Sequence, residues 1–70
     1  MKDWESEKKE IIKLLEDNGV VCSDMGDYIS FGEFDYHKDG SLWIYHLEKC
    51  IRTNMNINRL KQFINALYGD

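Results

Sequence analysis

The feature that most constrains the fold is the stretch YISFGEFDYHKDGSLWIYHL, residues 28–47, which holds six of the nine aromatic side chains. Two runs in which apolar and polar residues alternate flank the dipeptide Asp39-Gly40. Alternation is typical of a strand with one buried face, and Asp-Gly is among the strongest local signals of a tight hairpin turn. We therefore predict an antiparallel hairpin with strands over about 28–37 and 41–51.

The length of the turn decides which side chains share a face, because a shift of one residue exchanges the two faces of a strand. A two-residue turn at 39–40 pairs Tyr36 with Trp43 and separates the rings from the acids. A three-residue loop over 38–40 instead places Trp43 opposite Asp35. We predict the two-residue turn, with the rings as the floor on which the helices pack. The aromatic face then consists of Tyr28, Phe34, Tyr36, Trp43, Tyr45, Leu47 and Ile51.

Amphipathic patterns on both sides of the hairpin predict two helices. Apolar residues recur at helical spacings over about 4–18 and again over about 55–68. Gly19 can end the first helix, and Asn56 can cap the second. The short β-branched segment 20–23 predicts one further strand. The predicted order is α-β-β-β-α, an α+β fold in which both helices cover one face of an antiparallel sheet.

The length of the chain limits what it can contain. Seventy residues make one domain (1–70) and leave little material to wall the deep clefts in which enzymes hold catalytic groups. No pattern pairs a nucleophile with a base, and the only histidines, His37 and His46, lack the spacing of metal ligands. We therefore expect no catalytic activity, no cofactor and no metal.

The cysteines and the N-terminal segment bear on the compartment. Cys22 and Cys50 stand in no ligand spacing, and residues 1–10 are charged, unlike a signal peptide. We expect two reduced, buried thiols in a cytoplasmic protein. No run approaches the roughly 18 apolar residues that a membrane span needs, so we expect no membrane contact.

The charge is unevenly distributed along the chain. The net charge is −4, which divides into −6 over residues 1–40 and +2 over residues 41–70. The acidic excess favours a protein partner with a basic surface, although a solvated outer sheet face accounts for the same charges. The candidate partner-binding residues are Asp24, Asp27, Glu33, Asp35, Asp39 and Glu48.

Nucleic-acid binding is the alternative function, and it would use the basic C-terminal third. The candidate cations are Lys49, Arg52, Arg59 and Lys61. The predicted element order is similar to that of double-stranded-RNA-binding domains, but the second helix of that family opens with a lysine cluster and NMNINRLKQF has two cations. SFGEF resembles the aromatic strands of RRM domains, yet acids separate its rings, which favours core packing. Nucleic acid is thus the less favoured partner.

In size and charge, the chain resembles phage-encoded inhibitors of host defence nucleases, anti-CRISPR proteins among them. No motif of the sequence identifies such a family. The resemblance implies a small, non-enzymatic inhibitor that binds a nucleic-acid-processing or defence protein in the host cytoplasm. Homodimerisation through the neutral outer face of the second helix is a further hypothesis.

Overall fold

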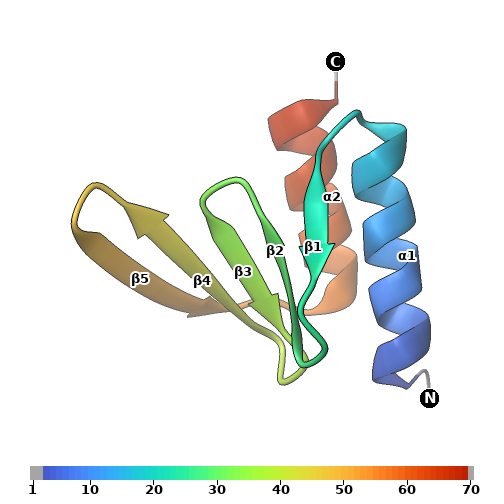
Figure 1. The fold of residues 1–70 in the computed structure, drawn as a ribbon, viewed down its shortest axis with the longest axis horizontal. Helices are drawn as coiled ribbons and strands as arrows, with labels where there is room; N and C mark the ends of the chain where they lie inside the picture. Colours follow the sequence, from blue (N-terminus) through green and yellow to red (C-terminus); the bar gives the residue numbers. More distant parts are fainter. Residues whose placement is uncertain (1–2, 70) are drawn as a thin grey trace.

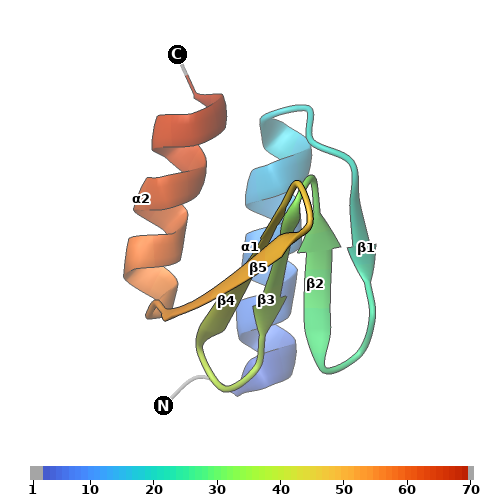
Figure 2. The same cartoon turned by 90° about the vertical axis from the view of Figure 1, so that its left-hand side faces the viewer.

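The computed structural model of the chain describes residues 3–69 and consists of a five-stranded antiparallel sheet with two helices on one of its faces (Figure 1, Figure 2). The strands follow one another across the sheet in chain order. The predicted α+β class and the packing of both helices on one face are confirmed. The elements are α1 (Trp4–Asp17), β1 (Cys22–Asp24), β2 (Tyr28–Phe31), β3 (Phe34–His37), β4 (Ser41–His46), β5 (Lys49–Asn54) and α2 (Ile57–Tyr68).

The sheet has two more strands than the sequence predicted, because each predicted long strand is broken by a two-residue turn. The segment 28–37 divides into β2 and β3 at Gly32-Glu33, where Gly32 has a φ of +56°. The segment 41–51 divides into β4 and β5 at Leu47-Glu48, and β5 extends to residue 54. The order is therefore α-β-β-β-β-β-α, and the predicted strands over 28–37 and 41–51 are wrong as continuous elements.

The predicted register between the third and fourth strands is also wrong. Tyr36 pairs with Leu42 and Asp35 pairs with Trp43, so the β3–β4 connection is the three-residue loop 38–40. Gly40 is the one residue of this loop with a positive φ, +88°, whereas the predicted tight turn needs two. Within the loop, the Gly40 N–H donates to the His37 carbonyl oxygen at 3.0 Å, and the Asp39 carboxylate accepts a hydrogen bond of 2.9 Å from the Ser41 N–H.

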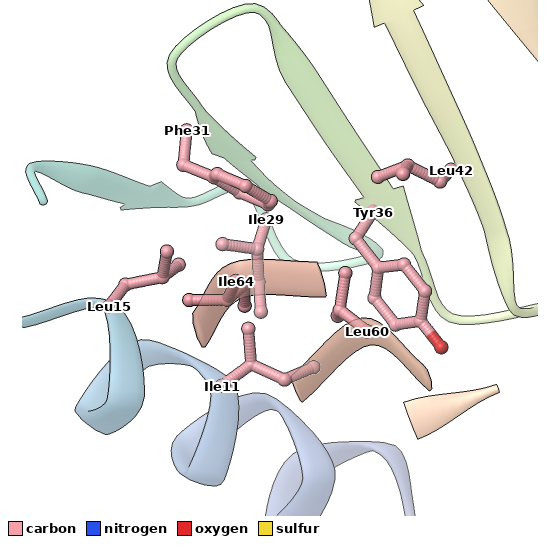
Figure 3. Packing of buried hydrophobic residues seen from close by; sticks show 8 residues of the cluster. All are labelled: Ile11, Leu15, Ile29, Phe31, Tyr36, Leu42, Leu60 and Ile64. Atoms are coloured by element: carbon pink, nitrogen blue, oxygen red, sulfur yellow. The ribbon is translucent and has the colours of Figure 1, made fainter. Parts of the chain in front are cut away.

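The core lies between the helices and one face of the sheet (Figure 3). The Tyr36 ring is buried there, and its hydroxyl donates to the Met55 carbonyl oxygen at 2.8 Å, just before α2. Phe34 packs edge-on against Phe63 of α2, with ring centroids 5.3 Å apart. The buried hydrophobic residues are Ile11, Leu15, Ile29, Phe31, Tyr36, Leu42, Leu60 and Ile64.

Polar contacts fix the start of α1 and attach it to the sheet. Asp3 caps its first turn by accepting from the Ser6 N–H at 2.8 Å. The indole N–H of Trp4 donates to the Gly26 carbonyl oxygen at 2.7 Å, in the turn between β1 and β2. The buried Lys8 ammonium lies 3.1 Å from Asp24 at the end of β1. These contacts set the position of the helix along the strands.

Candidate functional site

The face of the sheet opposite the helices is not covered by any other described element (Figure 1, Figure 2). Side chains alternate along a strand, so the buried Ile29 and Phe31 of β2 direct Tyr28 and Ser30 to this open face. In the same way, the buried Tyr36 of β3 directs Asp35 and His37 to the open face. The register therefore moves Trp43 and Tyr45 away from the helices, which corrects the prediction that they form the floor of the core.

Four planar groups, one from each of four neighbouring strands, form a continuous row across the open face. Tyr28 of β2 stacks on His37 of β3 with ring centroids 4.7 Å apart. The ring of Trp43 on β4 follows at 5.6 Å from His37, and the Arg52 guanidinium of β5 lies 5.3 Å from the Trp43 ring centroid. We call Tyr28, His37, Trp43 and Arg52 the planar row.

Polar contacts hold one end of the planar row in place. The indole N–H of Trp43 donates to the Ser41 hydroxyl oxygen at 3.2 Å, and that hydroxyl in turn donates to the Asp39 carboxylate. Asp39 also lies 3.6 Å from the Arg52 guanidinium. The pKa of Asp39 is lowered, first by the hydrogen bonds from Ser41 and then by the Arg52 charge. The loop that changes the register therefore also orients the indole and the guanidinium.

Three further side chains border the planar row on β3, β4 and β5. Tyr45 is 44% exposed and pairs across the sheet with the exposed Cys50. Asp35 is half-buried opposite Trp43. Desolvation, followed by the charge of Asp35, raises the pKa of Tyr45. The prediction of two buried cysteines is wrong for Cys50, whereas Cys22 is half-buried and desolvation raises its pKa.

Three of the six acids predicted to bind a partner lie at one end of the sheet. Asp24 contacts Lys8, and Asp27 lies 3.4 Å from Lys38 across the neighbouring β1–β2 and β3–β4 turns. The hydrogen bond from the Gly26 N–H, and then Lys8, lower the pKa of Asp24. Asp39 belongs to this end as well. These three acids are therefore already engaged by cations of the chain itself.

The other three acids are more dispersed. Glu33, in the β2–β3 turn, is hydrogen-bonded to His46, whose Nδ1 lies 3.0 Å from the Glu33 Oε2. Glu48 is exposed in the β4–β5 turn. Asp35 lies within the open face. Among the ion pairs of residues 3–69, none includes Asp35 or Glu48, and the six acids do not form one continuous surface.

The cations of the alternative function are dispersed as well. Arg52 lies on the open face, but Lys49 alternates with it on β5 and faces the helix side. Arg59 and Lys61 lie on α2, where Lys61 is 3.4 Å from Glu10 of α1. The four therefore do not line one path for a phosphate backbone, and one of them belongs to the planar row.

Hollows and ligand clusters offer little chemistry. An open depression of about 380 Å³ lies between the β3–β4 loop and the start of α2, and its lining contains no serine, cysteine or histidine. Within residues 3–69, no three of the histidine, cysteine, aspartate and glutamate side chains are grouped to hold a metal ion. No described helix is long and apolar enough to cross a membrane.

Comparison with known proteins finds no counterpart: no family model, no curated protein and no solved structure matches the chain.

Proposed function

We propose that the chain is a non-enzymatic protein-binding module whose partner lies against the open face of the sheet. The observation that carries this proposal is the planar row, which places a tryptophan and an arginine on an uncovered surface and holds both through Asp39 and Ser41. Tryptophan, tyrosine and arginine dominate the residues on which protein interfaces depend most. Side chains that are already oriented lose less entropy when a partner binds.

A protein partner fits the charges of this face better than a nucleic acid does. Asp35 lies within the face, and Asp27 and Asp39 lie at its edge. A phosphate backbone laid along the planar row would meet these carboxylates and a chain of net charge −4. The engagement of Asp24, Asp27, Glu33 and Asp39 within the chain leaves Asp35 and Glu48 as the support for a basic region on the partner.

The narrower proposal is that the module inhibits a nucleic-acid-processing or defence protein in the cytoplasm of a host cell. It rests on the length of the chain and on its net charge. It predicts that the captured protein is a nuclease, a polymerase or a protein bound to one, and that the module lowers the activity of this protein when the two are mixed. Full activity of the captured protein in the presence of excess module contradicts the inhibitor role alone.

The protein-binding proposal is tested by capture with the immobilised chain from a lysate of the host cell. Two variants are compared with the wild type: Trp43→Ala, at the centre of the planar row, and Gln62→Ala, on the exposed side of α2. Truncation of a central interface residue costs about 2 kcal/mol or more, which is a loss of about thirtyfold in affinity. We expect Trp43→Ala to lose the captured protein and Gln62→Ala to retain it. Equal capture by both folded variants contradicts the proposal.

The planar row also favours one second candidate, the stacking of single-stranded bases. Aromatic rings next to an arginine form the platform on which sequence-independent single-strand binders place successive bases. The test is fluorescence anisotropy of labelled DNA and RNA oligonucleotides at increasing salt. Binding that falls steeply with salt and is lost in Trp43→Ala supports this candidate, and an unchanged anisotropy at low salt excludes it.

A further inference from the structure

The fifth strand is an open edge of the sheet. β5 is hydrogen-bonded to β4 alone, and all six of its residues are exposed. Figure 1 shows that the β4–β5 hairpin projects away from both helices. The opposite edge, β1, has three residues and lies beside α1. Of the two edges, β5 therefore offers the longer and less hindered backbone.

The register shows which backbone groups of β5 face outward. In an antiparallel pair, hydrogen-bonded and non-hydrogen-bonded residue pairs alternate. The Met55 N–H donates to the Gly40 carbonyl oxygen at 2.7 Å, which places the bonded pairs at every second position from there. Cys50, Arg52 and Asn54 are the intervening residues. Their N–H and C=O groups point away from β4, where an added strand would bond to them.

The side chains of β5 select the charge of such a strand. Its sequence, KCIRTN, contains two cations and no acid. Residues 41–54 carry Lys49 and Arg52 against Glu48, a net charge of +1. Because the whole chain has a net charge of −4, the remaining residues have a net charge of −5. The edge is thus a locally basic segment of an acidic protein. Ile51, 56% exposed, adds an apolar contact on the helix side.

We propose that β5 accepts an extended, acidic segment of the partner protein as a sixth antiparallel strand. This inference rests on the proposed protein-binding function and names the element of the partner that is bound. The segment presents an acid beside Arg52 on the open face, and an apolar residue beside Ile51 with an acid beside Lys49 on the other face. Opposite charges and apolar pairs across neighbouring strands are stabilising, whereas like charges are not. For this reason, a second copy of the chain, which would bring the two cationic strands together, is not the occupant.

The probe is the hexapeptide Ser-Thr-Glu-Val-Thr-Glu, acetylated and amidated, whose antiparallel alignment places its glutamates beside Arg52 and Lys49 and its valine beside Ile51. Titration into the isotopically labelled full chain is followed by nitrogen–proton correlation spectra. We expect saturable shifts of the Cys50, Arg52 and Asn54 amides and slower hydrogen exchange at these positions, with the resonances of α1 unchanged.

Two modified peptides separate the backbone contribution from the charge contribution. Methylation of the amide nitrogen of the first glutamate removes a hydrogen bond to β5 and should abolish the shifts. Methylation of the valine nitrogen, which faces away from β5, should leave them in place. Replacement of both glutamates by lysine should weaken binding about tenfold, because each exposed pair contributes less than about 1 kcal/mol. Binding that tolerates either the first methylation or the charge reversal overturns the proposal.

Protein variants give the matching test on the side of the chain. Cys50→Pro removes an outward N–H that β4 does not use, and proline is tolerated at such edge positions. Cys50→Ser is the control that keeps the N–H. We expect Cys50→Pro, folded by the same spectra, to lose the peptide and Cys50→Ser to bind it. Light scattering that shows a dimer dissociated by Cys50→Pro identifies a second copy as the occupant and overturns the proposal.

Failure of the strand-addition inference can be distinguished from failure of the protein-binding proposal. If the peptide does not bind while Trp43→Ala still abolishes capture, the strand-addition inference fails and the protein-binding proposal stands. If the peptide binds but capture does not depend on Trp43, the partner binds the β5 edge without contacting Trp43. The placement of the interface on the open face is then contradicted.

Discussion

The hairpins β2–β3 and β4–β5 use similar turns in opposite surroundings. Both connections have two residues, and the first of each, Gly32 or Leu47, has a φ of 56°. The β2–β3 hairpin packs under the helices, and a Cβ on Gly32 would lie 3.1 Å from the Tyr68 hydroxyl of α2. Leu47 is 87% exposed at the tip of the projecting hairpin. One turn therefore uses glycine where a helix approaches, and the other strains a leucine where no described residue covers it.

The comparison shows how folding stability and surface composition are divided between the two hairpins. The β2–β3 hairpin supplies Ile29, Phe31 and Tyr36 to the core. The β4–β5 hairpin supplies Leu42 near its base. Beyond it, the hairpin carries three of the six large hydrophobic residues that are exposed within residues 3–69: Tyr45, Leu47 and Ile51. Exposed apolar side chains on a projecting element are typical of a surface that meets another molecule.

The largest expected difference is between core truncations in the two hairpins. Phe31→Ala should lower the free energy of unfolding by about 3–5 kcal/mol, because it leaves a cavity under both helices. Ile51→Ala removes a side chain that is mostly in water and should cost less than about 1 kcal/mol. Urea denaturation followed by circular dichroism measures both. Similar losses would show that the projecting hairpin contributes to the core as much as the covered one.

A smaller effect is expected at the covered turn. Gly32→Ala places a Cβ in a left-handed conformation, which costs about 1–2 kcal/mol, and directs it toward the Tyr68 hydroxyl. The free energy of unfolding should fall by at least this amount. Combining the substitution with Tyr68→Phe removes the hydroxyl but leaves the left-handed strain. If Gly32→Ala costs as much stability in the Tyr68→Phe background as in the wild type, the backbone conformation accounts for the whole effect. A smaller cost in that background shows that the contact with the hydroxyl contributes.

The acid dependence of stability should also differ between the Asp24 contact with α1 and the Asp39 contact with β5. The pKa of Asp24 is lowered in the fold, so its contribution to stability is present above the unfolded value near 3.8 and is lost as the pH falls through the folded value. Protonation removes a partner of the buried Lys8 ammonium. Asp24→Asn should therefore flatten the fall of Tm below pH 4. An unchanged pH profile would show that this contact with α1 does not stabilise the fold.

The same substitution at Asp39 provides the comparison for the projecting side. The pKa of Asp39 is lowered as well, but its cationic partner, Arg52, has a side chain that is 55% exposed. Asp39→Asn should lower Tm less than Asp24→Asn at neutral pH, because water solvates the guanidinium that is left. A larger loss of Tm for Asp39→Asn would show that the contacts of the β3–β4 loop stabilise the fold more than the contact between Asp24 and α1 does.

The smallest effect is expected at the tip of the projecting hairpin. Leu47→Gly relieves a left-handed leucine of about 1–2 kcal/mol of strain and adds about 0.5–1 kcal/mol of flexibility to the unfolded chain. The net gain in stability is about 0.5–1 kcal/mol by this estimate. We further expect the variant to capture its partner less well, because it loses an exposed apolar side chain. Higher stability with undiminished capture would exclude Leu47 from the interface.

The sequence predicted the two helices and the α+β class because both depend on periodic patterns over ten or more residues. It missed the Gly32-Glu33 turn, although a glycine between Phe31 and Phe34 is a recognisable signal of a second hairpin. Leu47 gave no such signal, since leucine seldom adopts a positive φ. The register depended on one residue, and Asp-Gly is compatible with both a two-residue turn and a three-residue loop that ends in glycine.

The candidate site was harder to predict because it depends on contacts between distant segments. Lys8 and Asp24 are neighbours only once α1 packs beside β1, and this pairing removes Asp24 from the predicted acidic surface. Similarly, the planar row exists only in the observed register, which places Trp43 opposite Arg52 and on the same face as His37. The sequence predicted an outer face that binds a partner and correctly placed Asp35 on that face, but it assigned Trp43 and Tyr45 to the opposite one.

The three-residue loop 38–40 constrains how the molecule can change over generations. Substitutions on the open face alter one surface side chain at a time and leave the core in place. Loss of a single codon within this loop would instead exchange the two sides of β4 and β5, carrying Trp43 toward the helices and Leu42 into water. Mutation can therefore explore new binding surfaces through replacement of side chains, while insertions and deletions between β3 and β4 are the events that the fold can least withstand.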